Sequence, residues 1–114
     1  MQPKIIFINS AGKKLESNLN PVDVEEIMRR LLNNDLLSGG RYTDLCIYNP
    51  ELFIQIEKQG ENHRLEFCLD CGQSKHYVDE KLSQNTDFFK SQDFIFNLVS
   101  NYFIEFSADA YKSA

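Results

Sequence analysis

Apolar side chains occupy every second position of residues 52–56 and again of residues 65–69, and Gly60 lies in the polar stretch between the two runs. A period of two residues is that of a β-strand, and two such runs joined by a short glycine-containing stretch predict a hairpin. This alternation is typical of an antiparallel sheet with one covered face and one solvent-facing face. The fold must therefore supply a layer that covers the hairpin on one side only.

Three further segments are expected to be strands of the same antiparallel sheet, and one is left undecided. Residues 4–9 are β-branched and apolar, and residues 73–78 follow the hairpin. In residues 43–48, Leu45 and Ile47 alternate with Asp44 and Cys46, which places Ile47 on the core side. Residues 13–19 fit either a loop or a short strand. The sheet is therefore expected to hold four to five strands.

Two helices are expected to cover one face of that sheet. Asn20 can cap the first, with Pro21 at the first helical position, and apolar residues follow at helical spacing up to Leu31. The second is expected from Ser91, its cap, to Phe106, with an apolar surface broad enough to pack on the sheet and on the first helix. The predicted fold class is α+β: an antiparallel sheet of four to five strands with two main helices on one face.

Length and composition indicate one domain over residues 1–114. Hydrophobic residues make up 42% of the chain and charged residues 25%, the mixture of an ordinary globular protein. No apolar run is long enough to span a bilayer, and the four-residue apolar run near the start is too short for a secretion signal. Three cysteines, an odd number, argue against a secreted disulfide framework, so a cytoplasmic protein is expected.

The chain is acidic, with a net charge of −5, and residues 51–80 hold seven carboxylates against three lysine and arginine side chains. A field of this sign repels phosphate backbones and anionic membrane surfaces, and it favours basic partners. Neither nucleic acid nor a membrane is therefore expected as a partner. A solvated face that keeps the protein in solution is the alternative explanation of the same charges.

The spacing of Cys68 and Cys71, with Gly72 after them, is that of half a zinc-ribbon knuckle. A tetrahedral site needs two more ligands, and the remaining candidates are Cys46 and the two histidines. Since the sequence holds no second paired motif, no metal and no other cofactor is expected, and the thiols are expected to stay reduced and partly buried.

No motif for catalysis is evident. Residues 9–14 follow a strand, as a phosphate-binding loop does, but they lack its first glycine and its Lys-Ser/Thr ending. His63 and His76 lie in no recognisable nucleophile motif and are expected at the surface. No catalytic residue is therefore assigned, and no enzymatic activity is expected.

The solvent-facing side of the predicted sheet mixes carboxylates with aromatic rings. Aromatic side chains act as buried anchors at interfaces, and carboxylates steer and orient a basic partner. The alternative is an exposed sheet face that tolerates aromatic residues. The candidate partner-binding residues, which include Glu61 of the acidic hairpin loop, are Asp44, Tyr48, Phe53, Glu57, Glu61, Glu66 and Asp70.

An acidic domain with a strand, a helix, an antiparallel meander and a C-terminal amphipathic helix resembles bacterial immunity proteins of contact-dependent growth-inhibition and related polymorphic toxin systems. The resemblance lies in the hairpin with Leu52-Phe53-Ile54-Gln55-Ile56, Gly60 and Leu65-Glu66-Phe67, and in the helix from Ser91 to Phe106. It covers the architecture of most of the chain and carries over no individual functional residue. It implies a non-enzymatic inhibitor, a monomer that forms a heterodimer with a cognate toxin protein, often a nuclease, and blocks its active site or substrate surface.

A dimeric acidic secretion chaperone, which presents an apolar groove to an effector segment, is the alternative function. Phe96, Phe103 and Ile104 lie off the main apolar stripe of the last predicted helix and could form the contact between two subunits. The two hypotheses differ in oligomeric state, because an obligate dimer favours the chaperone.

Overall fold

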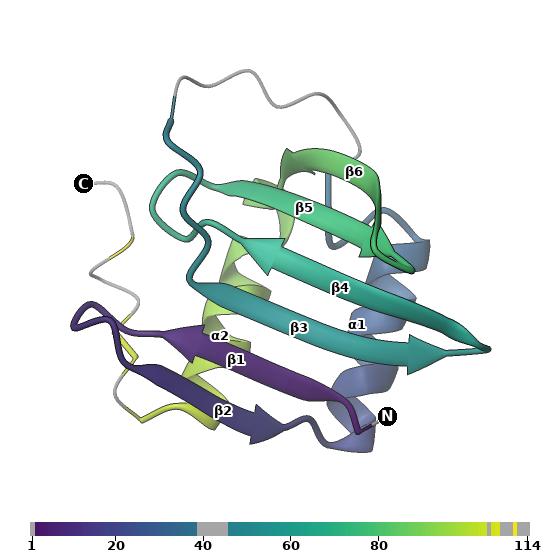
Figure 1. Ribbon diagram of the computed structural model, residues 1–114, viewed down its shortest axis with the longest axis horizontal. Coiled ribbons are helices and arrows are strands. Elements are labelled where there is room, and N and C mark those ends of the chain that lie inside the picture. The colour runs from purple at the N-terminus through teal and green to yellow at the C-terminus, as the bar shows by residue number, and fades with distance from the viewer. Residues whose placement is uncertain (1, 39–45, 105, 108–110, 112–114) are drawn as a thin grey trace.

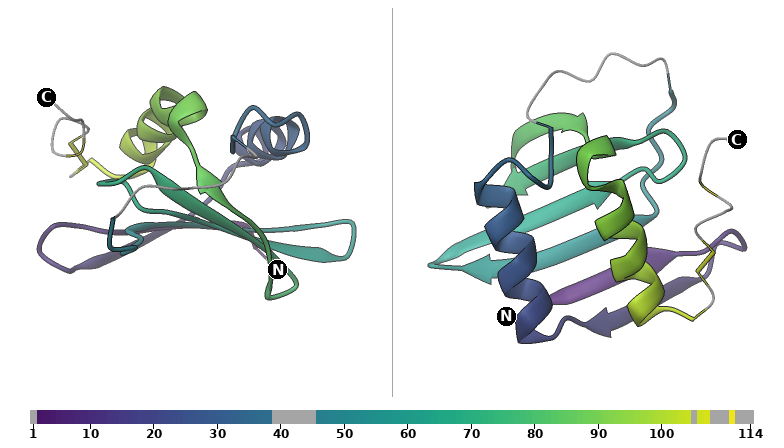
Figure 2. Two further views of the ribbon diagram at one scale, coloured as in Figure 1. Left: turned by 90° about the horizontal axis from the view of Figure 1, so that it is seen from above. Right: turned by 180° about the vertical axis from the view of Figure 1, so that it is seen from behind.

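In the computed structural model, which describes residues 2–38, 46–104, 106–107 and 111, a sheet and a pair of helices form two layers (Figure 1). Both helices lie against the same face of the sheet, as the sequence predicts, and they leave the other face open (Figure 2). Within the described residues the strands are β1 (Lys4–Ile8), β2 (Lys14–Asn18), β3 (Leu52–Lys58), β4 (Glu61–Phe67), β5 (Gln73–Val78) and β6 (Lys81–Asp87).

The described strands form one six-stranded sheet in the order β2-β1-β3-β4-β5-β6, and every neighbouring pair is antiparallel. Four of the five neighbouring pairs are consecutive in the chain. The fifth, β1 beside β3, forms because the segment containing α1 (Pro21–Leu32) carries the chain from the edge strand β2 back toward the middle of the sheet. Local pairing of this kind is the usual way in which an antiparallel sheet is built.

Tight two-residue turns join β3 to β4 and β5 to β6. Gln59 and Gly60 have φ angles of 51° and 82°, and Asp79 and Glu80 have φ angles of 50° and 67°. Two successive residues with positive φ form the type I′ turn, whose twist matches that of the flanking strands. Since β3 and β5 run in the same direction, the two turns lie at the same end of the sheet.

The first helix, α1, begins where the sequence predicts. Asn20 Oδ1 accepts a hydrogen bond from the backbone N–H of Asp23 at 2.8 Å, and Pro21 occupies the first helical turn. The cap satisfies one of the backbone N–H groups that a helix start leaves without a partner. The residues of this helix that are buried against the sheet are Ile27, Met28 and Leu31.

The second helix, α2 (Gln92–Tyr102), packs beside α1, as expected. The guanidinium carbon of Arg30 lies 4.1 Å from the centre of the Phe94 ring, a cation–π contact between the helices. The Tyr102 hydroxyl donates to Asp23 Oδ2 at 2.5 Å and so joins the end of α2 to the start of α1. No helix of the described residues has the length and apolar character needed to cross a bilayer.

The ends of α2 differ from the expectation. The Ser91 side chain makes no capping bond; it lies in a 3-10 turn, η1 (Phe89–Ser91), and its hydroxyl donates to the Leu36 carbonyl at 2.6 Å. The helix stops four residues before Phe106, whose ring nevertheless packs edge-on against Phe7 with ring centres 5.5 Å apart. The apolar residues beyond the helix fill the core from an irregular segment, so periodicity alone extended the helix too far.

The core lies between the two layers, and the strand register builds it from alternate residues. Ile5, Ile54 and Leu65 are direct neighbours across β1, β3 and β4, and each is at most 1% exposed. The helices bring Ile27 and Ile95, both fully buried, onto the same face. The period-two pattern of the sequence therefore identifies the covered face of the central hairpin correctly.

The strand predicted over residues 43–48 is wrong in its described part. Residues 46–50 are irregular, and Ile47, expected to face the core, is 90% exposed. Residues 43–45 lie outside the described residues. Two other segments supply strands instead: residues 13–19, left undecided by the sequence, contain β2, and β6 was not predicted. β6 is mostly polar, and it becomes a strand because the turn at residues 79–80 holds it against β5.

Candidate functional site

The open face of the sheet presents the side chains that alternate with the core positions. Phe53 lies opposite Glu66 across β3 and β4, and Arg64 lies opposite Tyr77 across β4 and β5. Neither helix covers this face, and the irregular segment 46–50 crosses only part of it (Figures 1 and 2). We use the name open face for the side chains of Phe53, Gln55, Glu57, Arg64, Glu66, Lys75 and Tyr77.

Glu66 is held at the centre of the open face by two donors. The Tyr48 hydroxyl donates to its Oε1 at 2.8 Å, and Arg64 Nε donates to its Oε2 at 3.1 Å. The side chain of Glu66 is only 13% exposed. Burial, together with the adjacent carboxylate, raises the pKa of Tyr48 far above its usual range, so the hydroxyl stays a donor. Glu66 therefore positions Tyr48, and its charge is balanced by Arg64.

Two cations lie over the two tyrosine rings of this face. Lys75 Nζ lies 4.2 Å from the centre of the Tyr48 ring, and the Arg64 guanidinium carbon lies 4.2 Å from the centre of the Tyr77 ring. Cation–π contacts of this kind restrict both partners. The aromatic side chains are consequently presented in fixed orientations, which lowers the entropy that binding would cost.

The acidic residues gather at one end of the sheet, around the two tight turns. Asp79 Oδ1 accepts the N–H of Asn62 at 2.9 Å, and the Asp79 N–H donates to the Asn62 carbonyl at 2.8 Å, which fixes the two turns side by side. Glu80 forms an ion pair with Arg64. We call the group Glu57, Glu61, Asp79 and Glu80 the acidic end.

Sequence reasoning identified two members of the acidic end, Glu57 and Glu61, and missed Asp79 and Glu80. The signal that could have found them is the second hairpin: a turn at residues 79–80 must lie at the same end of an antiparallel sheet as the turn at residues 59–60. The second hairpin was missed because the polar sequence of β6 has no alternation of apolar and polar residues that would predict a strand.

Asp70 lies at the opposite end of β4 from Glu61, a separation of about 20 Å for a strand of this length. It lines a pocket of about 470 Å³ together with Glu51, Asn9 and Tyr111. Glu51 is 9% exposed and accepts the backbone N–H of Leu69 at 2.6 Å, and burial raises the pKa of its carboxyl to about 7. Asp70 therefore does not join the other predicted carboxylates.

Exposed apolar side chains flank the open face. Ile47 precedes Tyr48 on the segment that crosses this face, and Leu82 of β6, which is 54% exposed, lies opposite Tyr77. The predicted anchor Phe53 is half-buried within the sheet. Ile47 and Leu82 were not among the predicted site residues, and the remaining predicted residue, Asp44, lies outside the described residues.

The two histidines meet on the covered side of the sheet and not at the surface as expected. His63 Nδ1 lies 2.9 Å from His76 Nε2, and the rings are stacked with centres 5.2 Å apart. His76 is 5% exposed, and burial, with the adjacent His63, lowers its pKa to about 4. His76 is therefore neutral at neutral pH, and the pair lies on the side of the sheet that the helices cover.

The loop at residues 9–14 uses its backbone groups internally. Asn9 Oδ1 accepts the N–H groups of Ala11 and Lys13 at 3.0 and 2.9 Å, and Gly12, with φ of 81°, closes the turn from β1 to β2. N–H groups that already have partners do not form a phosphate cradle, which supports the exclusion made from the sequence.

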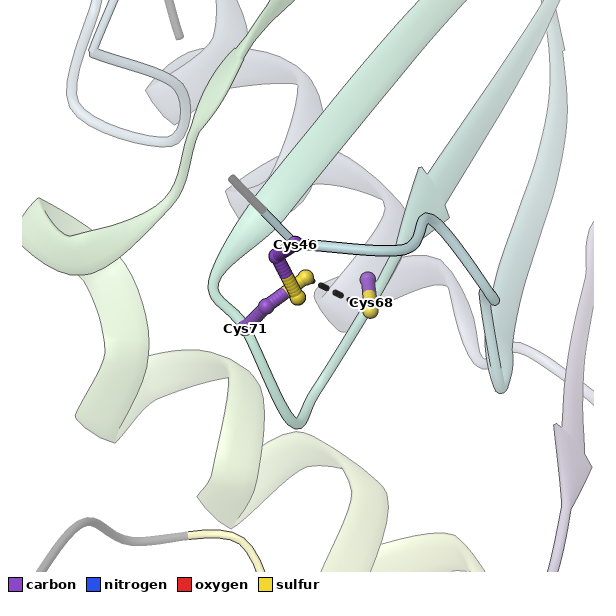
Figure 3. Close-up of side chains that lie close together, drawn as sticks. All are labelled: Cys46, Cys68 and Cys71. Atoms are coloured by element: carbon purple, nitrogen blue, oxygen red, sulfur yellow. Dashed lines mark hydrogen bonds between the residues drawn. The ribbon is translucent and has the colours of Figure 1, made fainter. Parts of the chain in front are cut away.

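The three cysteines converge where β4 turns into β5 (Figure 3). Their sulfur atoms all lie within 4.8 Å of one another, and the Cys68 and Cys71 sulfurs are 3.0 Å apart. Cys68 is buried and Cys46 is exposed. Burial raises the pKa of the Cys68 thiol to about 11, so without a cation it is protonated at neutral pH. Thiolates are ligands for zinc, and these residues could hold one ion.

Comparison with known protein families, with characterised proteins and with solved structures finds no match. The assignment of function therefore rests on the geometry and charge of the described residues.

Proposed function

We propose that this protein is a non-enzymatic inhibitor that binds a basic protein partner through the open face, in the manner of a bacterial immunity protein that neutralises a cognate toxin. The observation that supports the proposal is the combination, on one uncovered face, of fixed aromatic rings with carboxylates concentrated at one end. Interfaces combine aromatic anchors with a polar rim in this way.

The acidic end would select a basic partner and speed its approach. Glu57, Glu61 and Glu80 are all exposed. Carboxylates in such positions attract a surface rich in lysine and arginine over a distance of about a Debye length. A toxin that acts on nucleic acid carries such a surface, because it must hold phosphate groups. Occupation of that surface by the acidic end would exclude the substrate.

The apolar and aromatic side chains would keep the dissociation rate of the complex low. Phe53 and Tyr48 lie on either side of Glu66, and the exposed Ile47 adjoins Tyr48. Truncation of such anchors removes buried contact and acts mainly on the dissociation rate. We assign Glu66 a supporting role, because its carboxylate already has two donors. The inhibitor would act in the cytoplasm as a monomer that forms a heterodimer with its toxin.

The test is the binding kinetics of this protein with the toxin domain encoded by the neighbouring gene, at low and high salt. Glu57→Lys should slow association by about three- to tenfold at low salt and by much less at high salt. Asp93→Lys, which makes the same change of charge on the exposed surface of α2, is the matched control and should bind like the parent.

Phe53→Ala should raise the dissociation rate by about tenfold or more, whereas Ile104→Ala, which truncates a 97% exposed side chain just after α2, should not. Circular dichroism would verify that all four variants fold. If Glu57→Lys and Phe53→Ala are folded and bind the toxin with the parent's rates, the open face is not the interface and the proposal fails.

The chaperone alternative loses the observation that favoured it. Phe96 and Phe103, expected to lie at a subunit contact, are 3% and 6% exposed within the core of one chain. Of the three residues named for that contact, Ile104 alone is exposed. A single isoleucine is too small an apolar surface for a stable dimer.

A further inference from the structure

The three cysteines come from two separate segments of the chain. Cys68 directly follows β4, Cys71 lies three residues later in the turn to β5, and Cys46 lies in the irregular segment before β3. Sequence spacing relates the first two only. The tertiary fold adds the third, so three of the four ligands that a tetrahedral site needs lie together.

The turn that carries Cys68 and Cys71 is built to hold one shape. The Gly72 N–H donates to the Cys68 carbonyl at 2.9 Å, and the Cys68 N–H donates to the Gln73 carbonyl at 2.8 Å. Gly72 has φ of 80°, and a Cβ at this position would lie 2.2 Å from an atom of the Phe89 ring. Only glycine fits there. The two sulfurs are therefore aimed to the same point by a preformed turn, as in a zinc knuckle.

The distances between the sulfur atoms match those of a metal–thiolate site. Sulfur atoms bound to one zinc ion at about 2.3 Å in a tetrahedron are about 3.8 Å apart. The Cys68 and Cys71 sulfurs are 3.0 Å apart, and all three lie within 4.8 Å of one another, so small rotations of the side chains reach the required spacing.

We propose that Cys46, Cys68 and Cys71 bind one Zn²⁺ as thiolates, with the fourth coordination position open to water or to an external donor. Within the described residues, no histidine, aspartate or glutamate belongs to the same group of donors. Binding replaces three thiol protons, which pass to solvent, with one divalent cation, so the site carries a net charge of −1. Neither oxidation nor reduction is involved.

The ion would fasten the segment around Cys46 to the turn between β4 and β5. That segment continues into Ile47, which is exposed at the edge of the open face. It then reaches Tyr48, whose hydroxyl bonds to Glu66 on that face. A bound ion would therefore hold this irregular segment, which is not a strand of the sheet, in one position. Metal binding is measured on the protein alone, so its outcome is independent of the proposed toxin partner.

The experiment is a titration of the reduced, metal-free protein with Co²⁺ under anaerobic conditions, followed by Zn²⁺. Cobalt occupies zinc–thiolate sites and gives charge-transfer and visible bands that zinc does not. We expect one Co²⁺ per chain with intense thiolate charge-transfer absorption, bleached by one equivalent of Zn²⁺. Absence of these bands in protein whose three thiols are shown to be reduced would overturn the proposal.

Variants identify the ligands. Cys46→Ser replaces an exposed side chain, so the protein should stay folded while its affinity for Co²⁺ falls by about 100-fold or more. Cys71→Ser should have the same effect. His63→Gln is the matched control, because the structure places His63 outside the group of thiols, and it should bind as the parent does. Unchanged affinity in Cys46→Ser, or lost affinity in His63→Gln, would show that these three thiolates are not the site.

Zinc should also raise the melting temperature of the parent protein, because an ion that binds only the folded state stabilises it. The same addition should leave the melting temperature of Cys46→Ser almost unchanged. An equal rise in both proteins would place the ion elsewhere and would contradict the proposal.

Discussion

Three buried hydroxyl groups, those of Ser74, Thr86 and Ser91, differ in whether they have hydrogen-bond partners. The Ser91 hydroxyl, 2% exposed, donates to the Leu36 carbonyl at 2.6 Å. Among the residues that the structure describes, the Thr86 hydroxyl, 1% exposed, has no hydrogen-bond partner, and neither has the hydroxyl of Ser74, which lies opposite it across β5 and β6. A buried polar group without a partner costs free energy, whereas a bonded one costs little. The covered face of β5 and β6 is therefore less stable than an apolar surface would be.

We expect Thr86→Val, which keeps the shape and removes the hydroxyl, to raise the free energy of unfolding by about 1 kcal/mol. Ser91→Ala removes a bonded hydroxyl from an equally buried position and should lower it by about 1–2 kcal/mol, because the Leu36 carbonyl then loses its donor. Urea denaturation of both variants and the parent measures the two changes. Destabilisation by Thr86→Val would mean that its hydroxyl is bonded after all.

Among the elements, α2 contributes four buried apolar residues to the core, Ile95, Phe96, Leu98 and Val99. Its buried residues lie on the side that faces the sheet and α1, and the segment that follows adds two more phenylalanines beside Phe7. Helices of this length are marginal alone in water, so the packing of this face, and not the helix propensity, holds α2 in place.

Leu98→Ala tests this role of α2. Leu98 is 3% exposed, and its truncation should lower the free energy of unfolding by about 2–5 kcal/mol through lost burial and the cavity that remains. Asn97→Ala changes the adjacent, exposed position of the same helix and should alter stability by less than about 0.5 kcal/mol. Denaturant titration distinguishes the two; equal midpoints for both variants would show that α2 does not pack as described.

The pH dependence of stability is a property of the whole molecule, because two buried groups at different places act in opposite directions. The pKa of Glu51 rises from 4.5 to about 7, so the folded protein holds a proton that the unfolded chain loses, and stability falls as pH rises through this window. The pKa of His76 falls from 6.5 to about 4, so the unfolded chain binds a proton that the folded protein lacks, and stability falls as pH drops from 6.5 to 4.

Between about pH 4.5 and 6.5 these two effects nearly cancel in the parent protein. Glu51→Gln keeps a carbonyl oxygen to accept the Leu69 N–H and removes the titrating carboxyl, so His76 then acts alone. We expect the stability of this variant to rise between pH 4.5 and 6.5, by about 3 kcal/mol more than that of the parent over the same interval. Unfolding curves at four or five pH values measure the difference.

A control with the opposite sign is His76→Gln, which leaves Glu51 as the dominant group. Its stability should fall between pH 4.5 and 7, relative to the parent. Groups far from both residues contribute alike to all three proteins and drop out of the comparison. Parallel pH profiles of the parent and both variants would show that neither group has a shifted pKa.

The amino-acid sequence by itself determined which side of the central hairpin is buried, where α1 begins, and that helices cover one face of the sheet. These are local consequences of chemistry: the period-two pattern of residues 52–56 and 65–69, and the Asn20-Pro21 pair at the helix start. Strand β6 escaped prediction because its polar residues are held by the turn and by pairing with β5, which no property of the segment itself reveals.

For the candidate site, the sequence located the open face and the carboxylates Glu57 and Glu61 but not their neighbours. The tertiary structure decided that Asp79 and Glu80 join them, that Asp70 lies at the other end of the strand, and that Glu66 is bonded to Tyr48 and Arg64. It also brought Cys46 to the turn of Cys68 and Cys71, and His63 to His76. The reason is physical: alternation along a strand fixes the face on which a side chain lies, whereas its partners depend on pairing between segments distant in the sequence, which only the folded chain specifies.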